Sequence, residues 1–162
     1  MKRAAFFAFT LVLLVGSSTA QEMEAPRQVG VAHSGDDAVG QTLAYQLRER
    51  IKSSSQMELV DLSKAGSGVR INLTTLDPDQ GEIDSGNVTV FSSTWIYFFA
   101  RDGLSVQLYL GSQVGNYGVN RLDNAARNLT ATADELRRRV PDRLADLALL
   151  LQSGAEQDGS NK

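Results

Sequence analysis

The sequence predicts one α/β (α+β) domain, in which two helices pack on one face of a mixed, mostly antiparallel sheet. Three patterns support this prediction: an early helical stripe of apolar residues, an aromatic hairpin in the middle of the chain, and a long helical stripe near its end. With short strands between them, the elements follow the order β-α-β-β-β-β-α. The β-α-β start should cross over right-handed, which makes its two strands parallel.

A cleavable export signal is expected over residues 1–20. Two basic residues supply its positive start, an apolar run extends from Ala4 to Val15, and Ser18-Thr19-Ala20 provides the small residues that signal peptidase needs. The apolar run is shorter than the ~20 residues that span a bilayer, so we expect no transmembrane segment in the mature chain. Cleavage after Ala20 would place the mature protein in a periplasm or outside the cell.

Composition limits the function classes that the mature chain can have. It contains no cysteine, which excludes disulfides, cysteine metal sites and a lipid anchor on cysteine, and which favours a bacterial protein. Removal of the basic residues of the signal changes the formal net charge from −3 to −5, which disfavours nucleic-acid binding. The mature length suits a single domain over residues 27–152, with a polar, disordered tail over residues 153–162.

One helix among short strands is expected in the first half of the domain. A candidate strand at residues 27–33 leads into Ser34-Gly35-Asp36-Asp37, whose short acceptor side chains suit a helix N-cap. Further strands are expected at residues 57–62 and 69–74. The helix itself is expected over residues 38–53, where apolar residues recur every four positions: Val39, Leu43, Leu47 and Ile51.

An antiparallel hairpin is the clearest element of the sequence. Residues 87–100 are rich in β-branched and aromatic side chains, Arg101-Asp102-Gly103 suits a tight turn, and apolar and polar residues alternate over residues 104–110. Gly111 to Gly118 is interpreted as a glycine-spaced connection that leads from the hairpin to the last helix.

The last helical stripe runs from Leu122 to Leu151, with apolar residues at steps of three and four. A single helix of thirty residues would be ~45 Å long, which exceeds the width of a domain of this size. Pro141 inside such a helix would remove a hydrogen bond and clash with the preceding turn. We therefore expect a kink or a break near Val140.

No catalytic or cofactor-binding constellation emerges from the sequence. His33 lies beside Ser34, Asp36 and Asp37, but adjacent side chains at a strand end diverge and cannot form a triad. Helix capping with a surface histidine is the favoured interpretation. The basic run Arg137-Arg138-Arg139 is interpreted as a solvated helix face, because acidic residues precede two of its members by four positions.

The acidic segment from Asp77 to Asp84 provides the alternative hypothesis. It holds four carboxylates within eight residues, and Asp77 and Asp79 have the alternate spacing of calcium loops. Position five is Gly81, which has no side chain, and no glutamate stands at the twelfth position. A solvated loop is favoured, and a calcium-dependent ligand-binding protein or enzyme that uses residues 77–84 is the alternative.

A surface for a protein partner or for self-association is expected on the hairpin. A two-residue turn at Asp102-Gly103 would pair Phe99 with Val106 and bury four aromatic residues; a three-residue turn would pair Phe98 with Val106 and expose them. We favour the three-residue turn, because valine and isoleucine pack well under helices and tryptophan and tyrosine tolerate a half-wet surface. Coverage of this face by the leader, the acidic loop or the tail is the alternative. The candidate partner-binding residues are Phe91, Trp95, Tyr97, Phe99 and Tyr109.

Two segments resemble the opening of certain periplasmic accessory domains. Gly40-Gln41-Thr42-Leu43-Ala44 begins a helix through Ile51, and after Ser53-Ser54-Ser55 comes Met57-Glu58-Leu59-Val60. This arrangement is similar to the amino-terminal domain of TolB and to envelope proteins of the CsgG and LpoB type, over about a quarter of the chain. The resemblance implies an α/β fold and a non-catalytic role in envelope assembly, without naming site residues. We therefore expect an exported, non-catalytic envelope protein that binds a protein partner and needs no cofactor.

Overall fold

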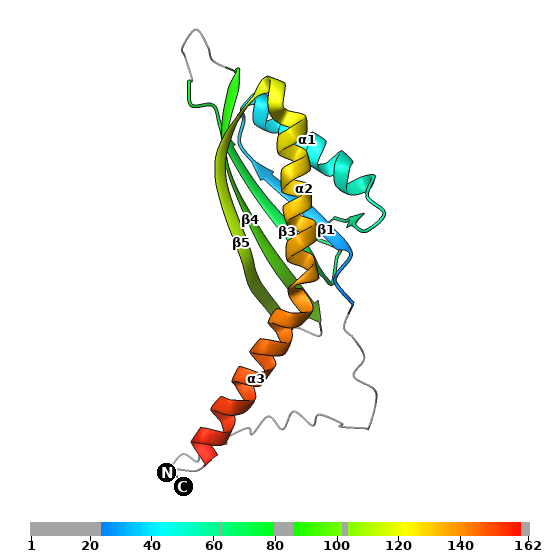
Figure 1. Ribbon diagram of the computed structural model, residues 1–162, viewed down its shortest axis with the longest axis vertical. Helices are drawn as coiled ribbons and strands as arrows, with labels where there is room; N and C mark the ends of the chain where they lie inside the picture. The colour runs from blue at the N-terminus through cyan, green and yellow to red at the C-terminus, as the bar shows by residue number, and fades with distance from the viewer. Residues whose placement is uncertain (1–23, 62, 80–85, 102–103, 160–162) are drawn as a thin grey trace, which may run out of the picture.

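The computed structural model describes residues 24–61, 63–79, 86–101 and 104–159, which form a mixed sheet with helices on one face (Figure 1). The α+β class and the β-α-β-β-β-β-α order are confirmed, with the last helix divided in two. In chain order the elements are β1 (Gln28–Ser34), α1 (Ala38–Lys52), β2 (Glu58–Leu59), β3 (Ser67–Leu76), β4 (Val88–Arg101), β5 (Leu104–Gly118), the 3-10 helix η1 (Val119–Arg121), α2 (Leu122–Arg138) and α3 (Val140–Gly159).

Across the sheet the strands follow the order β2-β1-β3-β4-β5. β1 lies between β2 and β3 and runs parallel to both, whereas β3, β4 and β5 are successively antiparallel. The predicted parallel β-α-β start is therefore confirmed. The second strand is shorter than the expected 57–62, since β2 has only 2 residues. This order leaves the short β2 and the long β5 as the two edges of the sheet.

α1 closely follows its expected boundaries because both of its ends are capped. A side-chain oxygen of Asp37 accepts a hydrogen bond from the backbone N–H of Gly40, and Ser53 is the C-cap. Gly40 lies against Thr75 of β3, and a Cβ on Gly40 would be 2.0 Å from Thr75 Oγ1. Glycine is therefore required for α1 to begin this close to the sheet.

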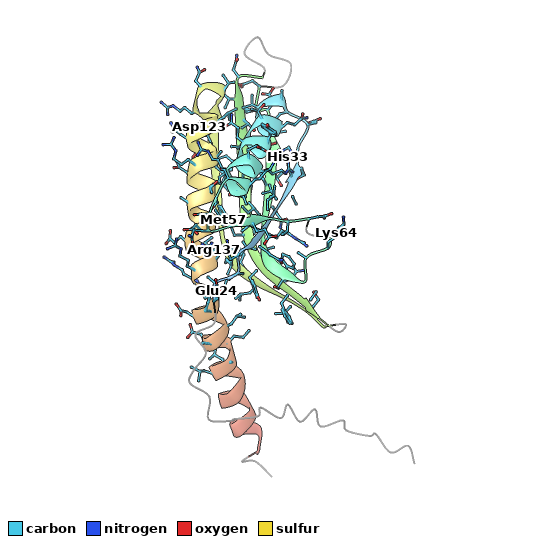
Figure 2. The ribbon with its side chains drawn as sticks, turned by 90° about the vertical axis from the view of Figure 1, so that its right-hand side faces the viewer. Glu24, His33, Met57, Lys64, Asp123 and Arg137 are labelled. Carbon is cyan, nitrogen blue, oxygen red and sulfur yellow. The ribbon has the colours of Figure 1, made fainter. Side chains whose placement is uncertain are left out.

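The core lies between the sheet and the two helices α1 and α2, which pack side by side (Figures 1 and 2). Arg50 of α1 forms an ion pair with Asp123 of α2, which ties the two helices together at their outer surface. The largest fully buried side chains come from β4, β3 and the two helices: Trp95, Phe91, Leu43, Leu47, Ile51, Ile71, Leu73 and Leu129. Burial of the stripes of α1 and α2 confirms the predicted apolar periodicity of these two helices.

The expected connection from Gly111 to Gly118 is wrong, because these residues continue β5 and pair with β4 as far as Val88. Their glycines admit neighbouring core side chains. A Cβ on Gly115 would lie 2.9 Å from Phe91 Cε1, and a Cβ on Gly111 would lie 3.5 Å from Leu136 Cδ1. Close approach of Phe91, and not a turn, is the physical reason for glycine at position 115, whereas a Cβ on Gly111 would make only an ordinary contact with Leu136.

The break near Val140 is confirmed, since α2 ends at Arg138 and α3 begins at Val140. Pro141 lies in the first turn of α3, where its missing N–H costs no intrahelical hydrogen bond. α3 then runs past the end of the sheet and away from it (Figure 1). It continues to Gly159, whereas a disordered tail was expected from Ser153.

The expected signal peptide over residues 1–20 lies outside the described residues. Among the residues that the structure describes, no helix is both long enough and apolar enough to cross a membrane.

Candidate functional site

The turn of the β4–β5 hairpin has two residues, so the favoured three-residue turn is wrong. Arg101 pairs with Leu104, and Phe99 pairs with Val106. This register directs the alternate side chains of β4 that include Phe91 and Trp95 toward the helices. A shift of one residue reverses the face of every side chain in a strand, which is why the choice of turn decides the surface.

The five candidate aromatic residues therefore do not form one exposed face. Phe91 and Trp95 are each only 1% exposed and belong to the core, and Tyr97 and Phe99 are half-buried on the same side of the sheet. Tyr109 points to the opposite side, where it is 58% exposed and its hydroxyl donates a hydrogen bond to Ser112. Of the predicted set, only Tyr109 is fully available on the open face of the sheet.

Tyr97 and Phe99 lie toward the tip of the hairpin, opposite Leu108 and Val106 in the β4–β5 ladder. All four side chains are half-buried, in contrast to the fully buried Trp95 farther along β4. Partial burial also raises the pKa of the Tyr97 hydroxyl above its ordinary value, because it disfavours the phenolate. The apolar side of the hairpin is thus only partly covered near its tip.

α3 carries the most exposed apolar surface among the described helices. The stripe that α2 buries against the sheet continues into α3 through Val140 and Leu144, but the sheet does not extend beneath the rest of α3 (Figure 1). Leu147 is 38% exposed and Leu149 is 64% exposed. Sequence periodicity alone could not reveal this exposure, because the spacing is the same in both helices.

The charged residues of α3 are mostly acidic. Asp142 and Asp146 are exposed, and Arg143 is the basic residue between them. Glu156 and Asp158 add two more acidic residues toward the end of the helix. The apolar segment from Leu147 to Leu151 therefore lies between acidic positions on both sides along the chain.

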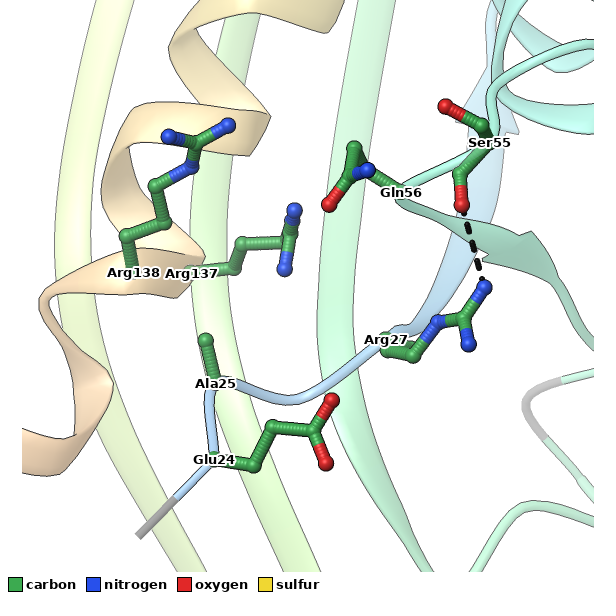
Figure 3. Close-up of a pocket in the computed structure, with 7 residues that line it drawn as sticks. All are labelled: Glu24, Ala25, Arg27, Ser55, Gln56, Arg137 and Arg138. Atoms are coloured by element: carbon green, nitrogen blue, oxygen red, sulfur yellow. Dashed lines mark hydrogen bonds between the residues drawn. The ribbon is translucent and has the colours of Figure 1, made fainter. Parts of the chain in front are cut away.

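A shallow pocket of about 290 Å³ lies where the start of the described chain crosses the end of α2 (Figure 3). Its basic side chains already have partners: Arg27 donates to the carbonyl of Ser55, and Arg137 and Arg138 both pair with Asp134. Arg137 is buried, so the interpretation of the whole basic run as a solvated face is wrong at this residue. These bonds hold Arg27 to the loop after α1 and hold Arg137 and Arg138 within α2, so all three basic side chains of the pocket lining are already paired.

His33 is half-buried at the end of β1, where its Nε2 lies 2.9 Å from Thr75 Oγ1. Burial is the main reason that its pKa is lowered, Arg48 lowers it further, and Asp37 opposes the shift. Asp37 caps α1 as predicted. In the described part of the chain, no three histidine, cysteine, aspartate or glutamate side chains are grouped so that they could hold a metal ion.

Asp77 closes the acidic loop through its carboxylate. One oxygen accepts the backbone N–H of Asp79 and the other accepts that of Gly86, each at 2.9 Å. Asparagine and aspartate side chains often stabilise loops by accepting nearby backbone N–H groups in this way. The remainder of the acidic segment, residues 80–84, lies outside the described residues.

Comparisons with known proteins do not place the chain in a family. It matches no protein-family profile and no curated protein. Among solved structures it is similar to a hypothetical protein from Chlamydia trachomatis, with 10% identity, a TM-score of 0.34, and coverage of 72% of this chain and 94% of that one. A minor lipoprotein from Acinetobacter baumannii shows 11% identity and a TM-score of 0.26, with coverage of 73% and 94%.

Rare lipoprotein B from Shewanella oneidensis shows 16% identity and a TM-score of 0.26, with coverage of 80% of this chain and 98% of that protein. Such low TM-scores establish neither a family nor a function for this chain. The resemblance to the TolB, CsgG and LpoB types is not confirmed by these matches.

Proposed function

We propose that this chain is exported and acts in the cell envelope as a non-catalytic protein that binds a protein partner. The observation that carries this proposal is α3, which extends past the sheet with exposed leucines at positions 147 and 149 (Figure 1). Exposed apolar surface of this kind is typical of an interaction site, since it costs free energy in water.

The chemistry of α3 indicates the kind of partner. From Leu147 to Leu151 the sequence is Leu-Ala-Leu-Leu-Leu, which is apolar on every side of a helix. Helices of this composition are normally buried, and a protein groove can bury them. The acidic residues before and after this segment disfavour the anionic surface of a membrane and favour a groove with a basic rim.

The low stability expected of an unpacked helix also supports a partner for α3. Most helical stability in proteins comes from packing of an apolar face, and short helices in water are marginal without it. Beyond Leu144 the described side chains of α3 are exposed, so they gain little from packing within this chain. Burial in a partner groove would add that stabilisation, and it would order the helix at the same time.

Retention of envelope proteins on the immobilised mature chain tests the proposal. Leu149→Asp introduces a charge into the exposed apolar segment, and Tyr45→Asp is the matched control, because Tyr45 is 62% exposed on α1. We expect the wild type and Tyr45→Asp to retain the same envelope protein, and Leu149→Asp to lose it. The melting temperatures of the three chains should be equal, which shows that all three are folded. Equal retention by all three would contradict a role for α3.

A further inference from the structure

The free edge of β5 has none of the usual features that prevent strand pairing, apart from one bulge. β5 has 15 residues and forms an edge of the sheet (Figure 1). It contains no charged residue and no proline. Edge strands usually carry lysine, proline or inward-pointing charges, because an unprotected edge pairs with other strands.

Two hydrogen bonds show which backbone groups of β5 point away from the sheet. The N–H of Val119 donates to the carbonyl of Asn87 at 2.9 Å, and the hydroxyl of Ser93 donates to the carbonyl of Gln113 at 3.4 Å. The backbone groups of residues 113 and 119 therefore face β4. Along an antiparallel strand, the backbone N–H and C=O groups of successive residues point alternately to the two sides. The backbone groups of Ser112, Val114 and Asn116 therefore face the free edge.

Val114 is also the most exposed large apolar side chain in the described chain, at 73%. Its neighbour Gly115 packs on Phe91, so Val114 points to the face of the sheet away from the helices. The bulge at Leu110 interrupts the ladder on one side, which leaves Gly111 to Gly118 as a regular segment centred near Val114.

We propose that two copies of this chain pair their β5 edges antiparallel, about a two-fold axis at Val114. In this register Val114 lies opposite Val114 of the partner subunit, and Ser112 lies opposite the partner's Asn116. Each of these pairs has outward-facing N–H and C=O groups, so each exchanges two hydrogen bonds. The two sheets become continuous, with both helical layers on one face.

A second copy fits this edge for reasons of charge and shape. The net charge of the chain is negative, which opposes self-association in general, but β5 brings no charge to the seam. Antiparallel pairing about Val114 also places Gly111 opposite the partner's Tyr117, and because Gly111 has no side chain, no two large side chains meet at this pair. A two-fold interface of this kind closes on itself, which limits the assembly to a dimer.

The absence of cysteine from the chain permits a direct test by cross-linking. Residues at a hydrogen-bonded antiparallel pair have Cα atoms about 5.5 Å apart, within the range of a disulfide. Under mild oxidation we expect mature Val114→Cys to form a covalent dimer rapidly, and Tyr45→Cys, at a position of α1 that is also largely exposed, to remain largely monomeric. Equal cross-linking of the two variants, or none, would overturn the proposal.

Molar mass in solution provides the second test, and it distinguishes self-association through the β5 edge from self-association through α3. We expect the wild type and Tyr45→Lys to have twice the monomer mass, and Val114→Lys to have the monomer mass, because it places like charges opposite each other. The melting temperature of the Val114→Lys monomer should show that it is folded. A wild-type monomer, or a dimer that persists in Val114→Lys and dissociates in Leu149→Asp, would contradict the proposal. Because this inference goes beyond partner binding by α3, each proposal can fail without the other.

Discussion

Trp95 pairs with Gly111 across the β4–β5 ladder, whereas the next residue, Ile96, pairs with Tyr109. Leu110 is therefore an extra residue in β5, and the ladder has a bulge at the level of the largest core side chain. A bulge bends the strand and increases its local twist. It separates a region near the hairpin tip, where Tyr97 and Phe99 are half-buried, from the regular segment around Val114.

Emission from Trp95, the only tryptophan of the chain, checks the hairpin register. Since Trp95 is 1% exposed, its fluorescence should be blue-shifted and resistant to quenchers. Trp95→Ser should lower the free energy of unfolding by about 3–5 kcal/mol, as truncation of a buried aromatic side chain does. Urea denaturation measures this loss, with Tyr109→Ser as the exposed control. A red-shifted, readily quenched Trp95 would mean that the alternative register is present.

Gly40→Ala tests the close approach of α1 to β3. In an exposed helix position this change stabilises by up to about 1 kcal/mol. Here the new Cβ would be 2.0 Å from Thr75 Oγ1, so we expect a net destabilisation of about 1–3 kcal/mol. Gln41→Ala, at the exposed neighbouring position, is the control and should change stability little. Greater stability of Gly40→Ala in urea denaturation would disprove this contact.

Charges placed along the last helical stripe should have different effects in α2 and α3. Leu136→Asp should reduce the free energy of unfolding by about 2–3 kcal/mol, because Leu136 packs against the sheet at Gly111. Leu147 is 38% exposed, so Leu147→Asp should cost less than about 1 kcal/mol. Both residues belong to the apolar stripe from Leu122 to Leu151, so the sequence pattern does not distinguish them. Equal losses in denaturation experiments would show that α3 is buried in solution.

The stability of the protein should fall on the acidic side of neutrality in part because of His33. Burial lowers the pKa of His33 in the folded state, so the unfolded chain binds a proton more readily. The contribution of His33 to the free energy of unfolding is complete above its pKa in the unfolded chain, about 6.5. This contribution is lost as the pH falls through that value toward the lower pKa of the folded state. Unfolding free energies at pH values of about 7.5 and 5.5 should differ less in His33→Gln than in the wild type. An equal or larger difference in the variant would refute this linkage.

Local patterns were sufficient to predict α1, the hairpin and the break before α3. Each depends on neighbouring residues: the four-residue stripe with Asp37 as N-cap, the alternation in the hairpin strands, and the hydrogen bond that Pro141 cannot make. These signals act within a few residues, so they can be recognised without knowledge of the tertiary structure.

The errors arose where distant residues decide the outcome. Gly111 and Gly115 resemble turn residues in the sequence, but both pair with β4, and Gly115 packs against Phe91, a residue distant in the sequence. The hairpin register depends on whether the turn has two or three residues. A difference of one residue moves every side chain of the strand to the other face of the sheet. The exposure of α3 depends on where the sheet ends. The burial of the candidate aromatic residues depends on the hairpin register. The functional surfaces proposed above therefore differ from the one that the sequence indicated.

Photo-cross-linking from position 149, in intact cells that export the protein, tests most directly whether α3 binds a protein partner. A photoreactive amino acid replaces Leu149 in one chain and Tyr45 in a control chain, since both side chains are largely exposed. Binding through α3 predicts a discrete covalent adduct with another protein from position 149 and none from position 45. No protein adduct from position 149, or the same adducts from both positions, would contradict the proposed function.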